Sequence, residues 1–293
     1  MKDLGAAKYC LGLKITRDRV RGELTLDQSK YIEEVLERFQ MSNCHPISTP
    51  IESSEKLDKT MSPKNSNETD DMKSVPYKEA VGCLNYIAHA TRPDISFAVN
   101  VVSQFSSNPG RKHWEAVKRI FRYLKGTWNS RIRYTKSGNS EMIGYTDADW
   151  GGDADSRRST TGYVFVLQGG AISWNVKKQP TVALSSCEAE FMAMSRTIQE
   201  ALWWRHLQEQ ILGALRIPIL CDNQSAMCIA KNGTYNPRTK HVDIRYHFVH
   251  EALDQGAVDL RYVNTKDQAA DGFTKPLTQS KMMIQKQLIG IED

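Results

Sequence analysis

The stretch "IGYTDADWGG" (residues 143–152) decides how the second half of the chain folds. Apolar and polar side chains alternate up to Asp147 and the alternation then stops, which is typical of a strand that ends there. Two glycines follow within five residues and indicate a turn. Asp147 therefore has two interpretations: a carboxylate presented at the end of a strand, or an acid in a surface turn. By position alone, Asp149 fits either description as well.

Short strands and helices follow one another on both sides of this stretch. Antiparallel strands followed by strand–helix crossovers predict a mixed sheet with helices packed on it. Ser185 and Glu188 form a capping-box pattern at the start of the longest helix. The predicted elements are strands at 130–138 and 140–149, a hairpin at 160–176, a helix from 185, a strand at 217–222, helices at 224–232 and 237–256, a strand at 257–263 and a final helix from 268.

The front half is predicted to open with a β-hairpin and to continue mainly as helix. Residues 52–76 contain two prolines, no aromatic residue and mostly polar side chains. We therefore expect an exposed linker there. The predicted elements of the front half are a hairpin at 9–28 and helices at 27–41, 77–91, 92–105 and 111–128.

Composition argues against several classes of protein. The 293 residues are 40% hydrophobic and 25% charged, as in a globular protein. The start lacks the apolar core of a secretory signal, and no run approaches the roughly 18 apolar residues of a membrane-spanning helix. The six cysteines form no CxxC pair. We therefore expect free thiols in a reducing compartment, and an intracellular protein without a membrane partner.

The net charge of +5 is unevenly distributed. Residues 1–140 hold 23 Lys and Arg against 16 Asp and Glu, whereas residues 141–293 hold 16 against 18. Between Arg111 and Lys136, nine basic side chains accompany a single acid, Glu115. Such a cluster repels itself unless it meets anions, so we predict phosphate contact there, with an ordinary solvated helix face as the alternative. The candidate nucleic-acid contacts are Arg111, Lys112, Lys118, Arg119, Arg122 and Lys125.

Four acidic positions lie at the ends of predicted elements around the sheet. They are Asp147, Asp222, Asp271 and one of the two glutamates Glu188 and Glu190. Carboxylates from separate elements that meet at one sheet edge repel one another and are tolerable around cations. Oxygen ligands favour Mg²⁺ or Mn²⁺ over zinc, and such a set suits two-metal phosphodiester hydrolysis. Other roles remain open, because Asp222 and Asp271 would also suit helix N-caps.

Segments along nearly the whole chain resemble the end of the Pol polyprotein of copia-type retrotransposons, in sequence and in order. Five segments resemble its ribonuclease H region: "GYTDADWGGDADSRRSTTGYVF" (144–165), "ISWNVKKQPTVALSSCEAEFMAM" (172–194), "CDNQSAMCIAKN" (221–232), "RTKHVDIRYHFVHE" (238–251) and "AADGFTKPL" (269–277). Others resemble the downstream part of its reverse transcriptase: "YCLGLKI" (9–15), "LDQSKYIEEVLERFQM" (26–41), "STPIE" (48–52), "YKEAVGCLNYIAHATRPDISFAVNVVSQF" (77–105) and "NPGRKHWEAVKRIFRYLKGT" (108–127).

This resemblance implies a particular fold. It is α/β, with a ribonuclease H-like mixed five-stranded sheet and flanking helices over residues 131–293. A mostly helical fragment of the reverse-transcriptase thumb or connection precedes it over residues 1–130. The implied location is the cytoplasm, in the context of a virus-like particle.

The resemblance also implies an activity, namely two-metal hydrolysis of the RNA strand of RNA–DNA hybrids with Mg²⁺ or Mn²⁺. The remainder of the reverse transcriptase is a further implied partner, and no small-molecule cofactor is implied. Side chains two positions apart on a helix point in directions roughly 200° from one another, so Glu188 and Glu190 cannot face the same ions. The family pattern selects Glu190, and it leaves Asp149 as an outer acid. The catalytic and metal-binding carboxylates implied are Asp147, Glu190, Asp222 and Asp271.

Two departures from the family pattern limit the expectation. The Tyr-x-Asp-Asp motif of the polymerase site does not occur in this chain, so no polymerase activity is expected from it by itself. The mobile histidine that many cellular ribonucleases H carry before the last aspartate is also missing, and His241, His247 and His250 are expected to pack or cap. The alternatives are a catalytically silent nucleic-acid-binding remnant of a retroelement and an integrase-like nuclease.

Overall fold

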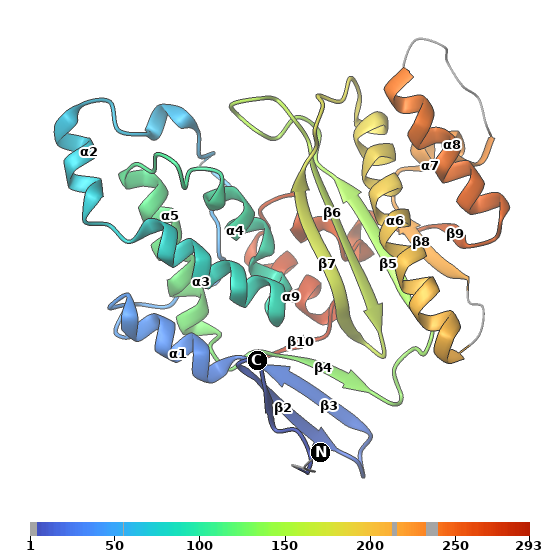
Figure 1. Ribbon diagram of the computed structural model, residues 1–293, viewed down its shortest axis with the longest axis horizontal. Helices are drawn as coiled ribbons and strands as arrows, with labels where there is room; N and C mark the ends of the chain where they lie inside the picture. The colour runs from blue at the N-terminus through green and yellow to red at the C-terminus, as the bar shows by residue number, and fades with distance from the viewer. Residues whose placement is uncertain (1–4, 55, 213–215, 233–239) are drawn as a thin grey trace. The chain divides into compact units, whose positions relative to one another are not determined.

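The computed structural model describes residues 5–54, 56–212, 216–232 and 240–293. The chain forms two compact units, shown in Figure 1. One consists of Met1–Gly138 together with Pro276–Asp293, and the other is Asn139–Lys275. Among the described helices, none combines the length and the apolar character needed to cross a bilayer.

The unit Asn139–Lys275 is built on a mixed five-stranded sheet with the strand order β7-β6-β5-β8-β9. Strand β6 pairs antiparallel with both β5 and β7, whereas β8 runs parallel to both β5 and β9. The parallel pairs arise because a helix returns the chain to the same end of the sheet each time. The strands are β5 (Ile143–Ala148), β6 (Thr160–Leu167), β7 (Gly170–Lys178), β8 (Ile217–Cys221) and β9 (Val258–Tyr262).

Three helices of this unit lie on one side of the sheet (Figure 1): α6 (Ser186–Leu212), α7 (Gln224–Asn232) and α8 (Lys240–Asp254). Phe191 and Met194 of α6 pack with Ile219 of β8 in the buried core. The ribonuclease H-like sheet with flanking helices is therefore confirmed.

The other unit is mostly helical, also as expected. Four helices pack on one another, and their buried apolar side chains form one core that includes Leu84, Val99 and Phe121. The helices are α1 (Ser29–Arg38), α3 (Tyr77–Ala90), α4 (Ser96–Ser103) and α5 (Arg111–Gly126). A second sheet has the order β1-β2-β3-β4-β10, with β1 (Tyr9–Cys10), β2 (Leu13–Asp18), β3 (Glu23–Asp27), β4 (Arg131–Thr135) and β10 (Ile291–Glu292).

A buried ion pair lies beside the helical core of this unit. Arg92 and Asp94 are both buried, and Arg92 Nη2 lies 2.7 Å from Asp94 Oδ2. The Tyr123 hydroxyl donates to the same carboxylate oxygen, and Arg92 Nη1 donates to the carbonyl of Thr127. Each charge is therefore hydrogen-bonded as well as paired, which is the condition under which buried ions are tolerated.

Three local features differ from the sequence prediction. Strand β4, expected to join the ribonuclease H-like sheet, instead pairs with β3 and β10. The segment 52–76 contains two short helices, η1 (Lys59–Met61) and α2 (Ser66–Lys73), whose N-terminal amides are capped by Asp58 and Asn65. These caps are local side-chain hydrogen bonds, so polar composition alone did not predict an ordered segment.

The third difference concerns the last helix. The expected helix starting near residue 268 is divided into a single 3₁₀ turn, η4 (Asp271–Phe273), and a separate helix, α9 (Gln279–Leu288). Pro276 explains the division, because the residue before a proline is disfavoured in helical geometry. Asp271 therefore lies on a short turn at the end of one unit, not on a long helix.

Candidate active site

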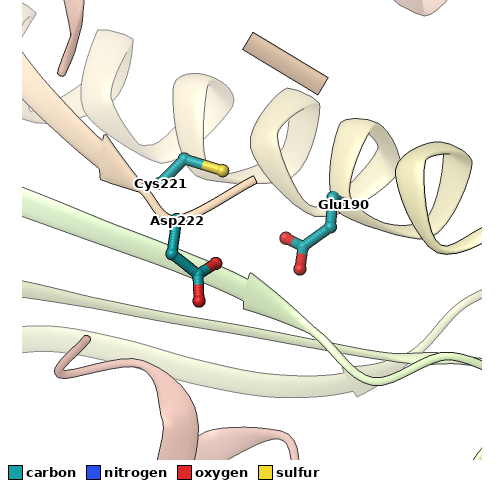
Figure 2. A group of neighbouring side chains, drawn as sticks. All are labelled: Glu190, Cys221 and Asp222. Carbon is teal, nitrogen blue, oxygen red and sulfur yellow. The ribbon is translucent and has the colours of Figure 1, made fainter. Parts of the chain in front are cut away.

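The four predicted carboxylates lie together at one edge of the ribonuclease H-like sheet. Asp147, Asp222 and Asp271 each offer a carboxylate oxygen within 4.8 Å of the others. Glu190 and Asp222 meet the same limit in a second group that includes Cys221. Figure 2 shows the carboxyl groups of Glu190, from α6, and Asp222, directly after β8, on the same side of the strand end. Asp222 is common to both groups and links all four acids.

Strand register explains why Asp147 and Asp222 meet. Tyr145 of β5 is paired with Leu220 of β8 in the parallel ladder. Two residues further on, each strand has reached its carboxyl end, where Asp147 and Asp222 lie. Carboxyl ends of neighbouring parallel strands meet at the same sheet edge, which is where ligands bind in α/β folds. The interpretation of Asp147 as a strand-end acid therefore agrees with the structure.

The two glutamates of α6 have different environments. The Glu188 amide donates to Ser185 Oγ at 3.1 Å, and the Glu188 carboxylate accepts from the Leu184 amide at 2.7 Å. The capping role predicted for Glu188 is confirmed, with the carboxylate reaching one residue further back than in the usual capping box. Glu190 lies among the acids and is 7% exposed. Within the described residues its buried Oε2 has no hydrogen-bond partner.

Close approach of two backbones brings Asp271 to the site. Gly162 of β6 is paired with Asp147 across the antiparallel ladder. A Cβ atom at Gly162 would lie 2.6 Å from the Phe273 Cβ and 2.8 Å from the Thr274 Cγ2. Only glycine leaves room for η4 to pack against β6 at this distance, so a residue far from Asp271 in sequence determines its position.

Burial and mutual repulsion raise the pKa values of two of the acids. Burial, reinforced by the charges of Asp147 and Asp222, raises the pKa of Glu190 to about 9. Burial also raises the pKa of Asp147 to about 6, although Lys275 and a hydrogen bond from Thr274 oppose the shift. Protons therefore take up part of the negative charge when no cation is bound.

Lys275 forms ion pairs with two of these acids. Its ammonium nitrogen lies 2.8 Å from Asp271 Oδ1 and 3.9 Å from Asp147 Oδ2. Burial lowers the pKa of Lys275, but the carboxylates of Asp147 and Asp271 outweigh this and raise it. Next to Lys275, the Thr274 hydroxyl donates to Asp147 Oδ2. Two consecutive residues directly after η4 thus contact Asp147.

The donor set fits a hard divalent cation. Four carboxyl groups supply oxygen ligands, the kind that Mg²⁺ and Mn²⁺ prefer. Cys221 lies near Glu190 and Asp222 (Figure 2), but it is fully buried and burial raises the pKa of its thiol. A thiol must lose its proton to bind a metal, so Cys221 fits a packing role and not that of a ligand.

Buried glutamines that sequence reasoning missed hold the site together. Gln268, 3% exposed, donates from Nε2 to the carbonyl of Thr146 at 3.0 Å and accepts from the Ala270 amide at 3.2 Å. It thereby joins the strand bearing Asp147 to the turn bearing Asp271. Its position shortly before Asp271 was the single clue in the sequence, since neither partner is predictable from a pattern.

Gln179 plays a similar role at α6. Its Nε2 donates to Thr161 Oγ1 at 3.1 Å and to the carbonyl of Ala189 at 2.9 Å, next to Glu190. Thr265 Oγ1 donates to Asp222 Oδ2 at 2.7 Å. The bond from Gln179 thus holds the turn of α6 that carries Glu190, and the bond from Thr265 holds Asp222 directly.

Asp149 faces a different partner from Asp147. Its carboxylate accepts from the Thr160 amide, and its own amide donates to the Thr160 carbonyl at 3.2 Å. These bonds close the loop between β5 and β6. Neither carboxylate group identified above contains Asp149, in the part of the chain that the structure describes.

The predicted basic contacts lie on α5, in the other unit. Arg119 donates to Thr49 Oγ1 at 3.1 Å and lies 3.4 Å from Glu52, and Arg122 donates to the carbonyl of His45 at 2.8 Å. Arg119 and Arg122 thus hold the segment before residue 53 against the helix. The exposed Arg111 and Lys112 are near Glu115, and Lys118 and Lys125 are half-buried on the same helix.

The histidines of α8 lie outside the acidic cluster. His250 Nδ1 is 3.1 Å from Asp254 Oδ2, one turn further along the helix. The His247 ring packs edge-on against Tyr246. These contacts agree with the expected packing and capping roles, while the side chain of His241 lies outside the described residues.

Comparison with known proteins places the chain among transposon proteins. It is 48% identical over 294 residues to the retrovirus-related Pol polyprotein from transposon TNT 1-94 of Nicotiana tabacum, covering 99% of this chain and 22% of that protein. It is 38% identical to the retrovirus-related Pol polyprotein from transposon RE1 of Arabidopsis thaliana, covering 99% and 19%. The chain thus spans about a fifth of the length of these curated relatives. No family model matches it.

A solved structure is similar to part of the chain. It is LC11-RNase H1 in complex with an RNA/DNA hybrid, with 12% sequence identity and a TM-score of 0.36, covering 46% of this chain and 94% of that one.

Proposed function

Because the chain belongs to the retrovirus-related Pol polyproteins of copia-type transposons, we propose that Asn139–Lys275 is a ribonuclease H domain. It would hydrolyse the RNA strand of RNA–DNA hybrids with two divalent metal ions. The observation that carries this proposal is the convergence of four carboxylates from four separate elements, three of them almost fully buried. So much negative charge is hard to explain at a purely structural site, because it costs stability unless cations bind.

Asp147, Glu190, Asp222 and Asp271 would hold the two ions, which we assign as Mg²⁺ or Mn²⁺. When bound, such a pair makes a water molecule more acidic and stabilises the leaving oxygen of the phosphodiester. Asp222 belongs to both ligand groups, so it suits a position between the two ions. Glu190 would supply an oxygen that has no hydrogen bond within the described residues.

Lys275 and Thr274 would act as positioning residues. Both contact Asp147 and directly follow the turn that carries Asp271. Lys275 balances part of the negative charge before metal ions bind. Its ion pairs with the carboxylates would break as the bound metal ions take over this role. Gln268 and Gln179 would keep the strand, the turn and the helix in register while the substrate binds.

Recognition of the hybrid would rest on backbone shape and 2′-hydroxyl groups, with little dependence on base sequence. We propose that the basic face of α5 tethers the duplex in the intact polyprotein. Arg111, Lys112, Lys118 and Lys125 are the strongest candidates there, because Arg119 and Arg122 already hold the segment before residue 53. The rest of the reverse transcriptase would be the protein partner, and polymerase activity is not proposed for this chain.

The experiment that tests the proposal is cleavage of an RNA–DNA hybrid labelled on each strand in turn. The purified chain is incubated with Mg²⁺, with Mn²⁺ or with EDTA, beside the variants Asp147→Asn and Asp222→Asn. Asp254→Asn, at an exposed acid beside His250, is the matched control. We expect metal-dependent cutting of the RNA strand by the parent and the control, and a loss of at least about a hundredfold in both site variants.

Two results would count against the proposal in different ways. Absence of metal-dependent cleavage, with salt-dependent hybrid binding retained, would favour a silent nucleic-acid-binding remnant. Cleavage that survives both substitutions would instead contradict the residue assignment while leaving the activity in place.

A further inference from the structure

A small basic pocket lies in the unit Asn139–Lys275, apart from the four carboxylates. Its volume is about 260 Å³, and four elements line it: the start of β6, the end of β7 with the residues that follow, the first half of α6, and α8. The lining residues are Thr161, Lys177, Lys178, Gln179, Pro180, Met192, Ser195, Arg196, Gln199 and Arg245. Four of these are cations and none is an acid.

Three of the cations have no acidic partner within the described residues: Lys177 of β7, Arg196 of α6 and Arg245 of α8. The fourth, Lys178, is paired with Asp153 at 2.6 Å. Three separate elements thus each bring to one pocket a positive charge that forms no ion pair with the described residues. Like charges gathered in this way repel one another, and an anion in the pocket relieves the repulsion.

Acids near the pocket are already engaged elsewhere. Asp153 binds Lys178 and accepts from the amide of Ser156 at 2.8 Å. Glu200, on the turn of α6 after Arg196, accepts from the Ser173 hydroxyl at 2.7 Å. Neither acid lines the pocket, so neither neutralises its interior.

Neutral hydrogen-bonding groups complete the pocket wall. Thr161 Oγ1 accepts from Gln179 Nε2, so its own proton remains available to an acceptor in the pocket. Ser195 is 2% exposed and lines the same pocket, and a serine hydroxyl carries a proton that it can donate. The Arg196 guanidinium donates to Gln199 Oε1 at 2.9 Å, which orients it without consuming its charge. Cations together with hydroxyl donors form the chemistry that recognises phosphate oxygens.

We propose that this pocket binds a phosphate group, specifically a phosphodiester of the nucleic-acid duplex that the domain acts on. Its volume of about 260 Å³ leaves room for a phosphate and part of its sugars. Gln179 connects the pocket to the catalytic cluster, since the same amide group that binds Thr161 also donates to the carbonyl beside Glu190. Only the naming of the duplex rests on the proposed ribonuclease H function.

The test removes two of the charges in the pocket. The test variant carries both Lys177→Gln and Arg245→Gln. The control variant carries both Lys231→Gln and Lys281→Gln, which remove two exposed lysines outside the pocket. Lys177→Arg with Arg245→Lys keeps both charges and reports whether the site tolerates substitution. Binding of a labelled RNA–DNA hybrid is followed by fluorescence anisotropy in EDTA over a series of salt concentrations. Binding of inorganic phosphate is followed by ³¹P line broadening. EDTA prevents cleavage during the measurement, so the binding assays test the pocket whether or not the chain has nuclease activity.

We expect the double glutamine variant to bind the hybrid about threefold more weakly and its salt slope to fall by about 1, as for one lost phosphate contact. The control pair and the charge-preserving pair should keep the parent slope. An unchanged slope with weakened binding of inorganic phosphate would overturn the duplex assignment in favour of a free phosphate. Equal behaviour of the double glutamine variant and the control pair in both assays would overturn the pocket altogether.

Discussion

Without metal, the protein is expected to lose stability as pH rises, and Glu190→Gln is expected to remove much of this loss. Burial and the neighbouring carboxylates raise the pKa of Glu190 from 4.5 to about 9. The folded state therefore keeps a proton that the unfolded chain releases. Because the pKa of Glu190 is higher in the folded state, the contribution of this carboxyl to stability is complete below about pH 4.5 and is lost progressively up to about pH 9.

The size of the effect follows from the width of that interval. A pH of about 7.5 is some three units above the pKa of this carboxyl in the unfolded chain. This difference sets an upper limit of about 4 kcal/mol on the cost of keeping Glu190 protonated in the folded state. Part of the pKa shift at Glu190 comes from the charge of Asp147, and the glutamine amide also needs hydrogen bonds of its own. We therefore expect about 2 kcal/mol of stabilisation by Glu190→Gln in EDTA at this pH.

The assay is urea denaturation followed by circular dichroism, in EDTA, at several pH values between about 5 and 9. Glu251→Gln, at an exposed acid of α8, is the matched control and should follow the parent. Added Mg²⁺ should stabilise the parent more than Glu190→Gln, because ligands bound only by the folded state raise its stability. If Glu190→Gln shows the same dependence on pH as the parent, the reasoning about this buried carboxyl is wrong.

Three further predictions concern the contacts that position the site and the helical core. Gly162→Ala places a methyl group 2.6 Å from the Phe273 Cβ, so we expect about 1–3 kcal/mol lower stability by urea denaturation together with reduced hybrid cleavage. Gln268→Ala removes the buried hydrogen bonds to the Thr146 carbonyl and the Ala270 amide and should cost about 1–3 kcal/mol, with a lower affinity for Mg²⁺ in calorimetry as the turn moves away from β5. Arg92→Met strands the buried carboxylate of Asp94 and should cost about 3–5 kcal/mol, whereas the double change with Asp94→Leu should recover most of it in thermal melts.

Much of the candidate site was predictable because it depends on local pattern. Alternation up to Asp147 indicated a strand end, and the Ser185 pattern identified the start of α6 and the capping role of Glu188. Helical geometry then excluded one glutamate from the site that holds the other. Family resemblance selected among acids whose positions patterns left open.

Errors arose where long-range pairing decides the outcome. Strand β4 has the sequence of an ordinary short strand, and only its partners β3 and β10 determine which sheet it joins. A strand pattern specifies which face is buried but not the neighbour on either side. The division of the final helix at Pro276 was visible in the sequence, yet the place of Asp271 on a single turn follows from packing of that turn on Gly162.

The sequence by itself determined the type and order of the main elements in Asn139–Lys275, and it placed several acids at the ends of those elements. These depend on the period of apolar residues and on motifs, both of which are local. The tertiary structure alone decided that the acids converge within a few ångströms, that Gln268 and Gln179 brace them, and that three cations from β7, α6 and α8 share one pocket. Distances between residues far apart in the chain depend on strand register and on close backbone approach, and neither is written in a short stretch of residues.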